Sequence, residues 1–212
     1  LDFEYDMKDL LYFRIDRKRK LPITTLLYAL GYKREEILEL FYDFKNFHFD
    51  KQTKKWSTKF NPDDYKRPIK LRYDLINSAN GQIVLKTGSK VNYVIAKKIH
   101  DGGLKNISVS SDFLLGKYIK NNLIDPITQE TFLTSGSSIV QENLDKIIES
   151  NINSLAIADV DPINKGSYLI DTLNVDKNTS KKEAVNDIYR VLRPGEPPSF
   201  EVAYDIFNNL FF

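Results

Sequence analysis

Hydrophobic residues alternate with polar ones near the N-terminus of the sequence, which is the period expected of β-strands. The alternation covers residues 3–5 and 11–15, on either side of a turn-like Asp-Met-Lys-Asp run at 6–9. This pattern predicts a β-hairpin. Pro22 then suits the start of a helix, and Gly31 suits the left-handed residue that follows a helix end.

A second helix is expected to begin at Glu35 and Glu36, because acidic side chains are favourable near the positive N-terminal end of a helix. Three of its apolar residues are expected to turn inward: Ile37, Leu38 and Phe41. From Phe44 to Phe60 the period returns to two around a polar centre, which predicts another β-hairpin.

The C-terminal part of the chain returns to a helical period. Ser180 followed by Glu183 is a capping-box pattern that opens a helix. Arg193 precedes Pro194, which disfavours further helix and ends it. A last helix is expected to have an apolar face made of Val202, Ala203, Ile206, Phe207 and Leu210. The R-P-G-E-P-P run between the two helices is therefore predicted to be a rigid elbow.

The middle of the chain contains an internal repeat. Sliding the sequence by 48 residues, from Gly88 to Gly136, aligns apolar positions without gaps. The aligned pairs include Leu75 with Leu123, Leu85 with Leu133, Val91 with Ile139 and Ile99 with Ile147. Each copy, about 70–117 and 118–165, is expected to contain two strands, a glycine turn, a short helix and a final strand. A chance match of apolar residues is the alternative.

Composition narrows the class of protein. The 212 residues are 42% hydrophobic and 28% charged, which fits globular domains with real cores. No apolar run approaches the roughly 18 residues that cross a bilayer, so no membrane partner is expected. The chain has no cysteine, which excludes disulfides and thiolate metal sites and agrees with a cytoplasmic location. A net charge of +2 is too small to argue for nucleic acid by itself.

The run R-I-D-R-K-R-K concentrates positive charge at the end of the first hairpin. It contains five cations and one acid: Arg14, Asp16, Arg17, Lys18, Arg19 and Lys20. Such a run can bind phosphates, and arginine can also bind base edges. A solvated loop of charges is the alternative. Arg193 at the elbow is either an ion-pair partner of Glu196 or a contact residue on a stiff support.

Catalytic motifs are missing from the sequence. His48 and His100 lie far apart and outside any metal or nucleophile motif, so both are expected to be structural or surface residues. The run at 159–166 resembles the start of a calcium loop, but Ile163 and Ile170 stand at ligand positions, which excludes that interpretation. Gly102-Gly103 is expected to end a helix, because no phosphate-binding glycine motif surrounds it.

Four stretches together resemble the lobe region of the bacterial DNA-directed RNA polymerase β subunit. They read LDFEYDMKDLLYFRIDRKRKLPITTLLYALGY, EEILELF, GSYLIDTLNVD and IYRVLRPGEPPSFEVAYDIFNNLFF. The resemblance is strongest over 1–41 and 166–212. Residues 42–165 are more loosely similar to a lineage-specific insertion within that lobe. NKGSYLIDTL departs from the usual proteobacterial Asp-His-Gly-Pro-Tyr-Ile-Ser run, so a role tied to that run is not carried over.

This resemblance implies an α+β fold, in which a helical and hairpin lobe of two segments, 1–41 and 166–212, is interrupted by an inserted, internally duplicated small α+β module at 42–165. It also implies that the chain is an internal fragment. In the family, the active-site elements of β lie outside this stretch, and another subunit, β′, binds the magnesium. The fragment is therefore expected to have no catalytic residue, metal site or cofactor of its own.

The family lobe forms one wall of the main channel, near downstream DNA and the non-template strand. Asp16, Arg17 and Arg193 match family positions that face this strand, and Arg14, Lys18, Arg19 and Lys20 are weaker phosphate candidates. The expected partners are DNA, the rest of β, the β′, α and σ subunits, and transcription factors on the inserted module. The alternative is an assembly or factor-docking platform without significant DNA contact. An independent hydrolase or transferase is disfavoured by the lack of any His, Cys or metal cluster.

Overall fold

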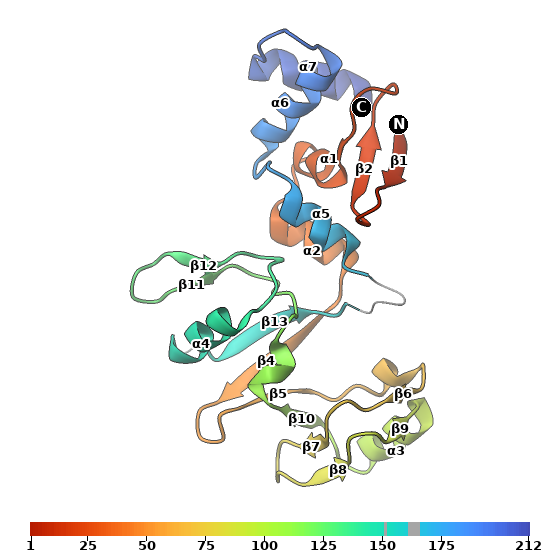
Figure 1. Ribbon diagram of the computed structural model, residues 1–212, viewed down its shortest axis with the longest axis vertical. Helices are drawn as coiled ribbons and strands as arrows, with labels where there is room; N and C mark the ends of the chain where they lie inside the picture. The colour runs from red at the N-terminus through yellow and green to blue at the C-terminus, as the bar shows by residue number, and fades with distance from the viewer. Residues whose placement is uncertain (151, 161–165) are drawn as a thin grey trace.

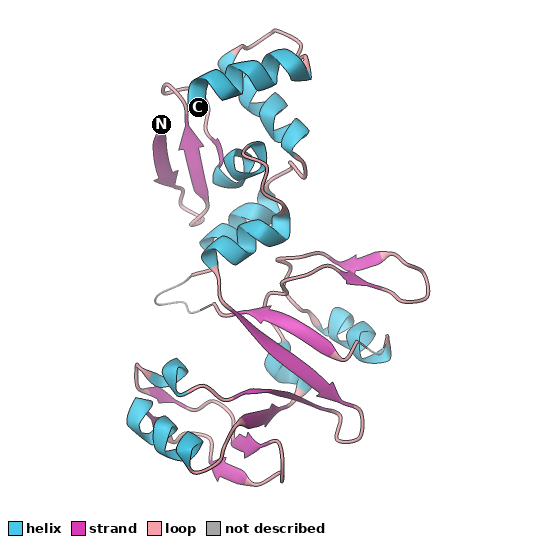
Figure 2. Ribbon diagram, turned by 180° about the vertical axis from the view of Figure 1, so that it is seen from behind, coloured by secondary structure: helices cyan, strands magenta, loops and turns pink. Residues whose placement is uncertain are grey.

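Both chain termini lie at one end of an elongated molecule (Figure 1). The computed structural model describes residues 1–150, 152–160 and 166–212. Its architecture is mixed α+β with antiparallel strand pairing, as the sequence predicts at this level. Figure 2 shows helices gathered at the end that holds the termini, while most strands lie in the other half.

The end with the termini contains a small antiparallel sheet and a group of helices. The hairpin predicted at residues 3–15 is present as β1 and β2, and β3 pairs with β2. The elements are β1 (Asp2–Tyr5), β2 (Leu11–Arg14), β3 (Leu21–Pro22), α1 (Ile23–Ala29), α2 (Arg34–Phe41), α5 (Tyr168–Val175), α6 (Lys181–Leu192) and α7 (Phe200–Phe211). One hydrophobic core unites both chain segments, with Phe13, Ile37, Ile170, Ile188 and Phe207 almost fully buried.

Polar contacts also join these two distant segments. The hydroxyls of Thr24 and Thr25, at the start of α1, donate to the carboxylate of Asp176. The backbone N–H of Leu11 donates to Thr172 Oγ1 at 2.8 Å. Because Thr24, Thr25 and Thr172 are fully buried, these bonds satisfy groups that water cannot reach.

The helix ends follow the predicted local chemistry. Gly31 adopts φ +103° after α1, and the N–H of Tyr32 bonds back to the carbonyl of Leu27, as in a Schellman motif. At the start of α6, Ser180 Oγ accepts from the N–H of Glu183 at 3.3 Å. The Glu183 carboxylate bonds the N–H and hydroxyl of Thr179, one residue earlier than a capping box requires.

Three apolar residues expected to face the core are instead half exposed: Phe41, Val202 and Leu210, each at 48%. Phe41 is the last residue of α2, and the next residue, Tyr42, is the buried aromatic, with its hydroxyl donating to the Gly166 carbonyl at 2.9 Å. In α7 only Ala203 and Phe207 are fully covered. Helical periodicity gives the direction of a side chain but not how far the core extends along the helix.

The hairpin predicted between Phe44 and Phe60 is formed by β4 (Phe44–Asp50) and β5 (Lys55–Lys59). It lies inside a sheet of six described strands in the order β13-β4-β5-β10-β7-β8. The other elements of this half are η1 (Pro62–Tyr65), β6 (Ile69–Lys70), β7 (Leu75–Asn77), β8 (Ile83–Leu85), β9 (Lys90–Val91), α3 (Tyr93–Asp101), β10 (Asn106–Val109), η2 (Ser111–Leu114), β11 (Leu123–Ile124), β12 (Thr131–Leu133), α4 (Gln141–Glu149) and β13 (Ser154–Ala158).

The strand pairing around this hairpin has local two-fold symmetry. Ile107 of β10 pairs with Thr58, Leu155 of β13 pairs with Phe47, and Phe47 pairs with Thr58 across the hairpin. Ile107 and Leu155 are 48 residues apart in the sequence. The helices α3 and α4 begin at Tyr93 and Gln141, again 48 residues apart. The two segments therefore present their last strands to the hairpin in equivalent registers.

The symmetry ends beyond those strands. β7 and β8 extend the sheet beside β10, whereas β11 and β12 form a separate two-stranded sheet. One hydrophobic core lies under α4 and includes the fully buried Trp56. Another lies under α3 and includes Phe60 and Val91.

Candidate nucleic-acid interface

Two consecutive residues of the basic run have left-handed backbone conformations. Asp16 and Arg17 have φ of 50° and 55°, and the N–H of Lys18 donates to the carbonyl of Ile15 at 3.0 Å. Positive φ at both central residues is the pattern of a type I′ turn. This turn connects β2 to β3 and leaves the side chains of Asp16 and Arg17 exposed. Aspartate tolerates this conformation, but for arginine it is sterically unfavourable.

The proline elbow contains a second defined turn. The N–H of Glu196 bonds the carbonyl of Arg193 at 3.3 Å, and Gly195 has φ +86°. Proline at the second position and a positive-φ glycine at the third are the signature of a type II turn. Pro194 fixes its own φ near the value that this turn needs, and Gly195 adopts the positive φ without strain, so Arg193 directly precedes a well-defined turn.

Glu196 does not form an ion pair with Arg193. Its carboxylate accepts a hydrogen bond from the hydroxyl of Tyr189 in α6 at 2.9 Å. That bond, together with burial and the nearby negative charge of Glu196, raises the pKa of Tyr189. The elbow is thus fastened to α6 through Tyr189, and the exposed Arg193 makes no ion pair with any described residue.

Lys18 connects the basic run to the elbow. Its Nζ donates to the carbonyl of Leu192 at 2.7 Å, where Leu192 is the last residue of α6. A cation at this position stabilises the unsatisfied carbonyls and the negative end of the helix. The turn that contains Arg17 and the elbow that begins at Arg193 therefore lie side by side, although they are far apart in the sequence.

Arg14 and Lys20 are engaged within the first hairpin. Arg14 donates to both carboxylate oxygens of Glu4, at 3.3 and 3.0 Å, and to the carbonyl of Lys18. The hydrogen bond from Arg14 lowers the pKa of Glu4. Lys20 lies 3.4 Å from the same carboxylate and 4.3 Å from the centroid of the Tyr12 ring. Both cations are thereby partly neutralised.

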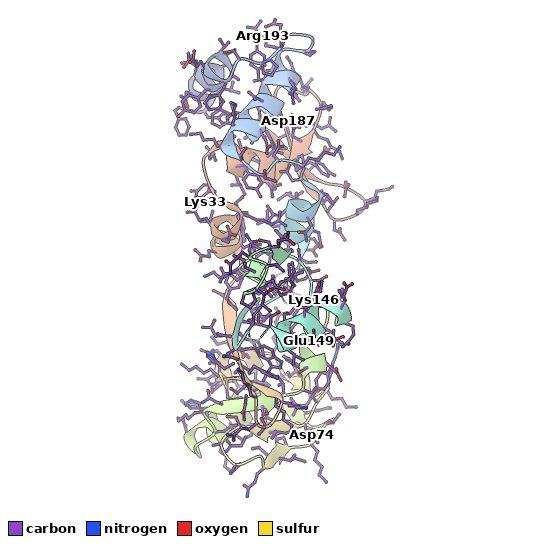
Figure 3. The ribbon with its side chains drawn as sticks, turned by 90° about the vertical axis from the view of Figure 1, so that its left-hand side faces the viewer. Lys33, Asp74, Lys146, Glu149, Asp187 and Arg193 are labelled. Carbon is purple, nitrogen blue, oxygen red and sulfur yellow. The ribbon has the colours of Figure 1, made fainter. Side chains whose placement is uncertain are left out.

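The seven candidates thus fall into two groups. Arg14, Lys18 and Lys20 are half-buried and hold the hairpin and the end of α6 in place. Asp16, Arg17, Arg19 and Arg193 are exposed and form no ion pair with any described residue. Figure 3 shows Arg193 near one end of the long axis of the molecule.

The contact between Lys18 and Leu192 could not be found from the sequence, because nothing in either segment identifies the other. The type II turn could have been predicted from the sequence, since Pro-Gly after an arginine is its local signature. The bond between Tyr189 and Glu196 had only a weak signal, a tyrosine one turn before the helix end.

The other motifs considered in the sequence do not form a second functional site among the described residues. Among residues 1–150, 152–160 and 166–212, no group of three or more His, Cys, Asp or Glu side chains is arranged to hold a metal ion. The calcium-like run at 159–166 lies largely outside the described residues. Gly102 and Gly103 end α3 as predicted, with Gly103 at φ +109°. In the described part of the chain, every helix is too short or too polar to cross a bilayer.

A family model and individual relatives both relate this chain to the same family of proteins. Residues 1–165 match the family model described as RNA polymerase Rpb2, domain 2. The chain is 40% identical over 212 residues to the DNA-directed RNA polymerase subunit beta of Caulobacter vibrioides (strain NA1000 / CB15N), and 42% identical over 212 residues to that of Rickettsia prowazekii (strain Madrid E). Both alignments cover 100% of this chain and 15% of the relative. The subunit of Jannaschia sp. (strain CCS1) is 39% identical, with 16% of its length covered.

Proposed function

Because the chain belongs to the RNA polymerase Rpb2 domain 2 family, we propose that it forms part of the DNA-channel wall of a bacterial RNA polymerase, as a segment of the β subunit. In this role it contributes contacts to downstream and non-template DNA and no catalytic group. The assembled enzyme would catalyse nucleotidyl transfer with magnesium bound by another subunit, in the cytoplasm, together with the rest of β and with β′, α and σ.

The proposed architecture has two parts. Residues 1–41 and 166–212 form the lobe, and residues 42–165 form an inserted, duplicated module. A core made mostly by the two terminal segments, together with Tyr42 and Ala158, supports the lobe, and two other cores under α3 and α4 support the insertion. The 48-residue recurrence of helices and strand pairings supports a duplication with copies at about 70–117 and 118–165.

The observation that carries the DNA-contact proposal is the junction of the two turns through Lys18 and Leu192. It brings together a turn with a sterically unfavourable Arg17 and an elbow whose Arg193 forms no ion pair with a described residue. Sterically unfavourable backbone that persists in a folded protein occurs preferentially at functional sites. Arginines fixed in advance lose less conformational entropy when they contact a phosphate backbone. Asp16 is assigned to the same contact surface, and Arg19 adds a phosphate contact.

Fork-junction DNA binding by reconstituted polymerase tests this role. We expect Arg17→Ala with Arg193→Ala to weaken binding and to reduce the slope of log affinity against log salt by about 2, one for each lost phosphate contact. Lys51→Ala with Lys97→Ala is the matched control, because both lysines are exposed on the inserted module and make no ion pair with described residues. Equal slopes for the two double variants would overturn the DNA-contact role.

The second candidate function is a factor-docking platform without significant DNA contact. It is favoured by the exposed hydrophobic side chains of the inserted module, such as Ile83, Val94 and Ile127. Deleting 42–165 from β distinguishes the two roles. If the lobe forms the channel wall, the polymerase keeps its salt-dependent DNA binding after the deletion. If the chain is a docking platform, the deletion abolishes binding of the partner, and substitution of Arg17 does not change the DNA affinity.

A further inference from the structure

The inserted module contains a groove of about 820 Å³ that the DNA-contact role does not use. It lies over the sheet formed by β4, β5 and β10, and is bordered by residues 69–75 and by the segment that follows η2. Its floor is apolar, with Phe47, Phe60 and Leu75 among the buried residues that line it. Figure 3 shows Asp74, which lines the groove, and Arg193 near opposite ends of the molecule.

The rim of this groove has unneutralised positive charge. Four cations line it without an ion pair to any described residue: Lys59, Lys70, Arg72 and Lys117. Burial lowers the pKa of Lys117, the nearby charge of Lys45 adds to this effect, and the Asp159 carboxylate opposes it. A partly desolvated cation that forms no ion pair with a described carboxylate favours an anionic group from another molecule.

The two carboxylates that line the groove are already engaged. Asp64 lies 3.0 Å from Lys45, which also contacts Asp159 at 3.2 Å. Asp74 accepts hydrogen bonds from the N–H and the hydroxyl of Thr87, both at 2.7 Å. Lys45 is therefore paired at one end of the groove. Asp74 stays ionised, because its hydrogen bonds to Thr87 lower its pKa, but the cations Lys59, Lys70, Arg72 and Lys117 outnumber it.

A cluster of aromatic side chains lies on the side of the groove that contains Arg72 and Lys117. The ring of Phe113 lies 5.6 Å from that of Tyr73, edge to face at 73°, and 6.0 Å from that of Phe47. Tyr73 is half exposed. Lys117 Nζ lies 4.5 Å from the Phe113 ring centroid. Aromatic side chains and arginine over an apolar floor are enriched at the anchor sites of protein interfaces.

We propose that this groove binds an acidic peptide segment of a partner protein, with an aromatic or aliphatic side chain of the peptide on the apolar floor and its carboxylates at Lys70, Arg72 and Lys117. The proposal rests on, and specifies, the factor-interaction role of the inserted module. A single-stranded nucleic acid is disfavoured, because base stacking requires open ring faces. Lys117 Nζ lies over one face of the Phe113 ring, and the rings of Tyr73 and Phe113 pack against each other in a T-shaped arrangement.

The test uses polymerase reconstituted with the full β subunit and fluorescence anisotropy. The probe is a fluorescein-labelled peptide of Asp and Glu with one Phe and one Leu at its centre. We expect Lys70→Glu with Arg72→Glu to weaken its binding at least about tenfold. The matched control, Lys51→Glu with Lys97→Glu, makes the same charge change on the same module outside the groove and is expected to change affinity less than about twofold.

Changes to the probe test the apolar floor without altering the protein. Replacing the central Phe and Leu by Ser should weaken binding about tenfold. Equal losses for groove and control variants, no binding of the peptide, or preferential groove-dependent binding of a labelled oligothymidine would each overturn the proposal. Arg17→Ala with Arg193→Ala should leave peptide binding unchanged, and the groove variant should leave fork-junction binding unchanged, so the two hypotheses fail separately.

Discussion

The ammonium group of Lys18 bonds the backbone carbonyl of Leu192 at 2.7 Å, joining the first basic turn to the end of a helix 174 residues later. Lys18 is the residue after Arg17, and Leu192 is the residue before Arg193. One hydrogen bond therefore relates the positions of the two arginines that we assign to DNA contact. The same bond satisfies a carbonyl that the end of α6 leaves without an intrahelical partner.

Lys18→Met should destabilise the fold. Methionine keeps much of the aliphatic chain but removes the donor and the positive charge at the end of α6. A loss of about 1 kcal/mol in the free energy of unfolding is expected, because the bond is charge-assisted but only partly buried. Urea unfolding of the 212-residue chain measures it. Arg19→Met, in an exposed residue without an ion pair among the described residues, should change stability by less than about 0.5 kcal/mol, and equal effects would show that the Lys18 bond contributes nothing.

Arg17→Gly should separate stability from DNA binding. Glycine is unstrained at φ 55°, whereas alanine carries the same Cβ as arginine. The glycine variant is expected to be more stable than Arg17→Ala by about 1 kcal/mol. Both variants should lose the same fork-junction affinity, since both lack the guanidinium. A glycine variant less stable than the alanine variant would mean that the turn carries no steric cost.

Gly195→Ala should disturb the elbow. A Cβ at this position meets no atom within 4 Å, so the expected cost comes from φ +86° alone. We expect a loss of about 1 kcal/mol or more in the free energy of unfolding, and weaker DNA binding because the turn that holds Arg193 relaxes. Gly195→Asn is the comparison, because asparagine tolerates positive φ better than alanine and should lose less. Thermal unfolding of both variants distinguishes the cost of the positive φ from an effect of side-chain volume, because asparagine is the larger residue.

Local chemistry made much of the fold predictable. The hairpins, the helix after Pro22 and the glycine helix ends follow from period and from turn residues, which act over a few positions. The exposure of Phe41 was not predictable in the same way, because it depends on whether a distant segment covers the last turn of α2. Tyr42 is buried instead, through a contact with Gly166 that no local pattern indicates.

In the candidate site, too, local features were predictable from the sequence and long-range contacts were not. The sequence identified the basic run and Arg193, but its local chemistry did not separate Arg14, Lys18 and Lys20 from Arg17, which only the family resemblance ranked higher. Their difference arises from Glu4 and Leu192, which neutralise or occupy three of the cations and leave Arg17 exposed. Those partners come from another strand and from the end of a distant helix, and only the tertiary structure brings them to the run.

Alkaline pH should destabilise the inserted module through Tyr65. Burial raises the pKa of Tyr65 from 10.0 to about 12. The folded state therefore keeps a proton that the unfolded chain has already lost. Stability from this difference is complete below pH 10 and disappears as the pH rises from 10 to about 12, with a total of about 2 to 3 kcal/mol.

Tyr65→Phe tests this linkage, because phenylalanine has no proton to lose. Its loss of unfolding free energy between about pH 9 and about pH 11.5 should be smaller than that of the unsubstituted chain, as measured by urea unfolding. Some loss should remain, since burial also raises the pKa of Tyr28 and Tyr42. Tyr32→Phe is the control, because that ring is 41% exposed. If the two variants lose the same stability over this range, the buried hydroxyl of Tyr65 is not the group responsible.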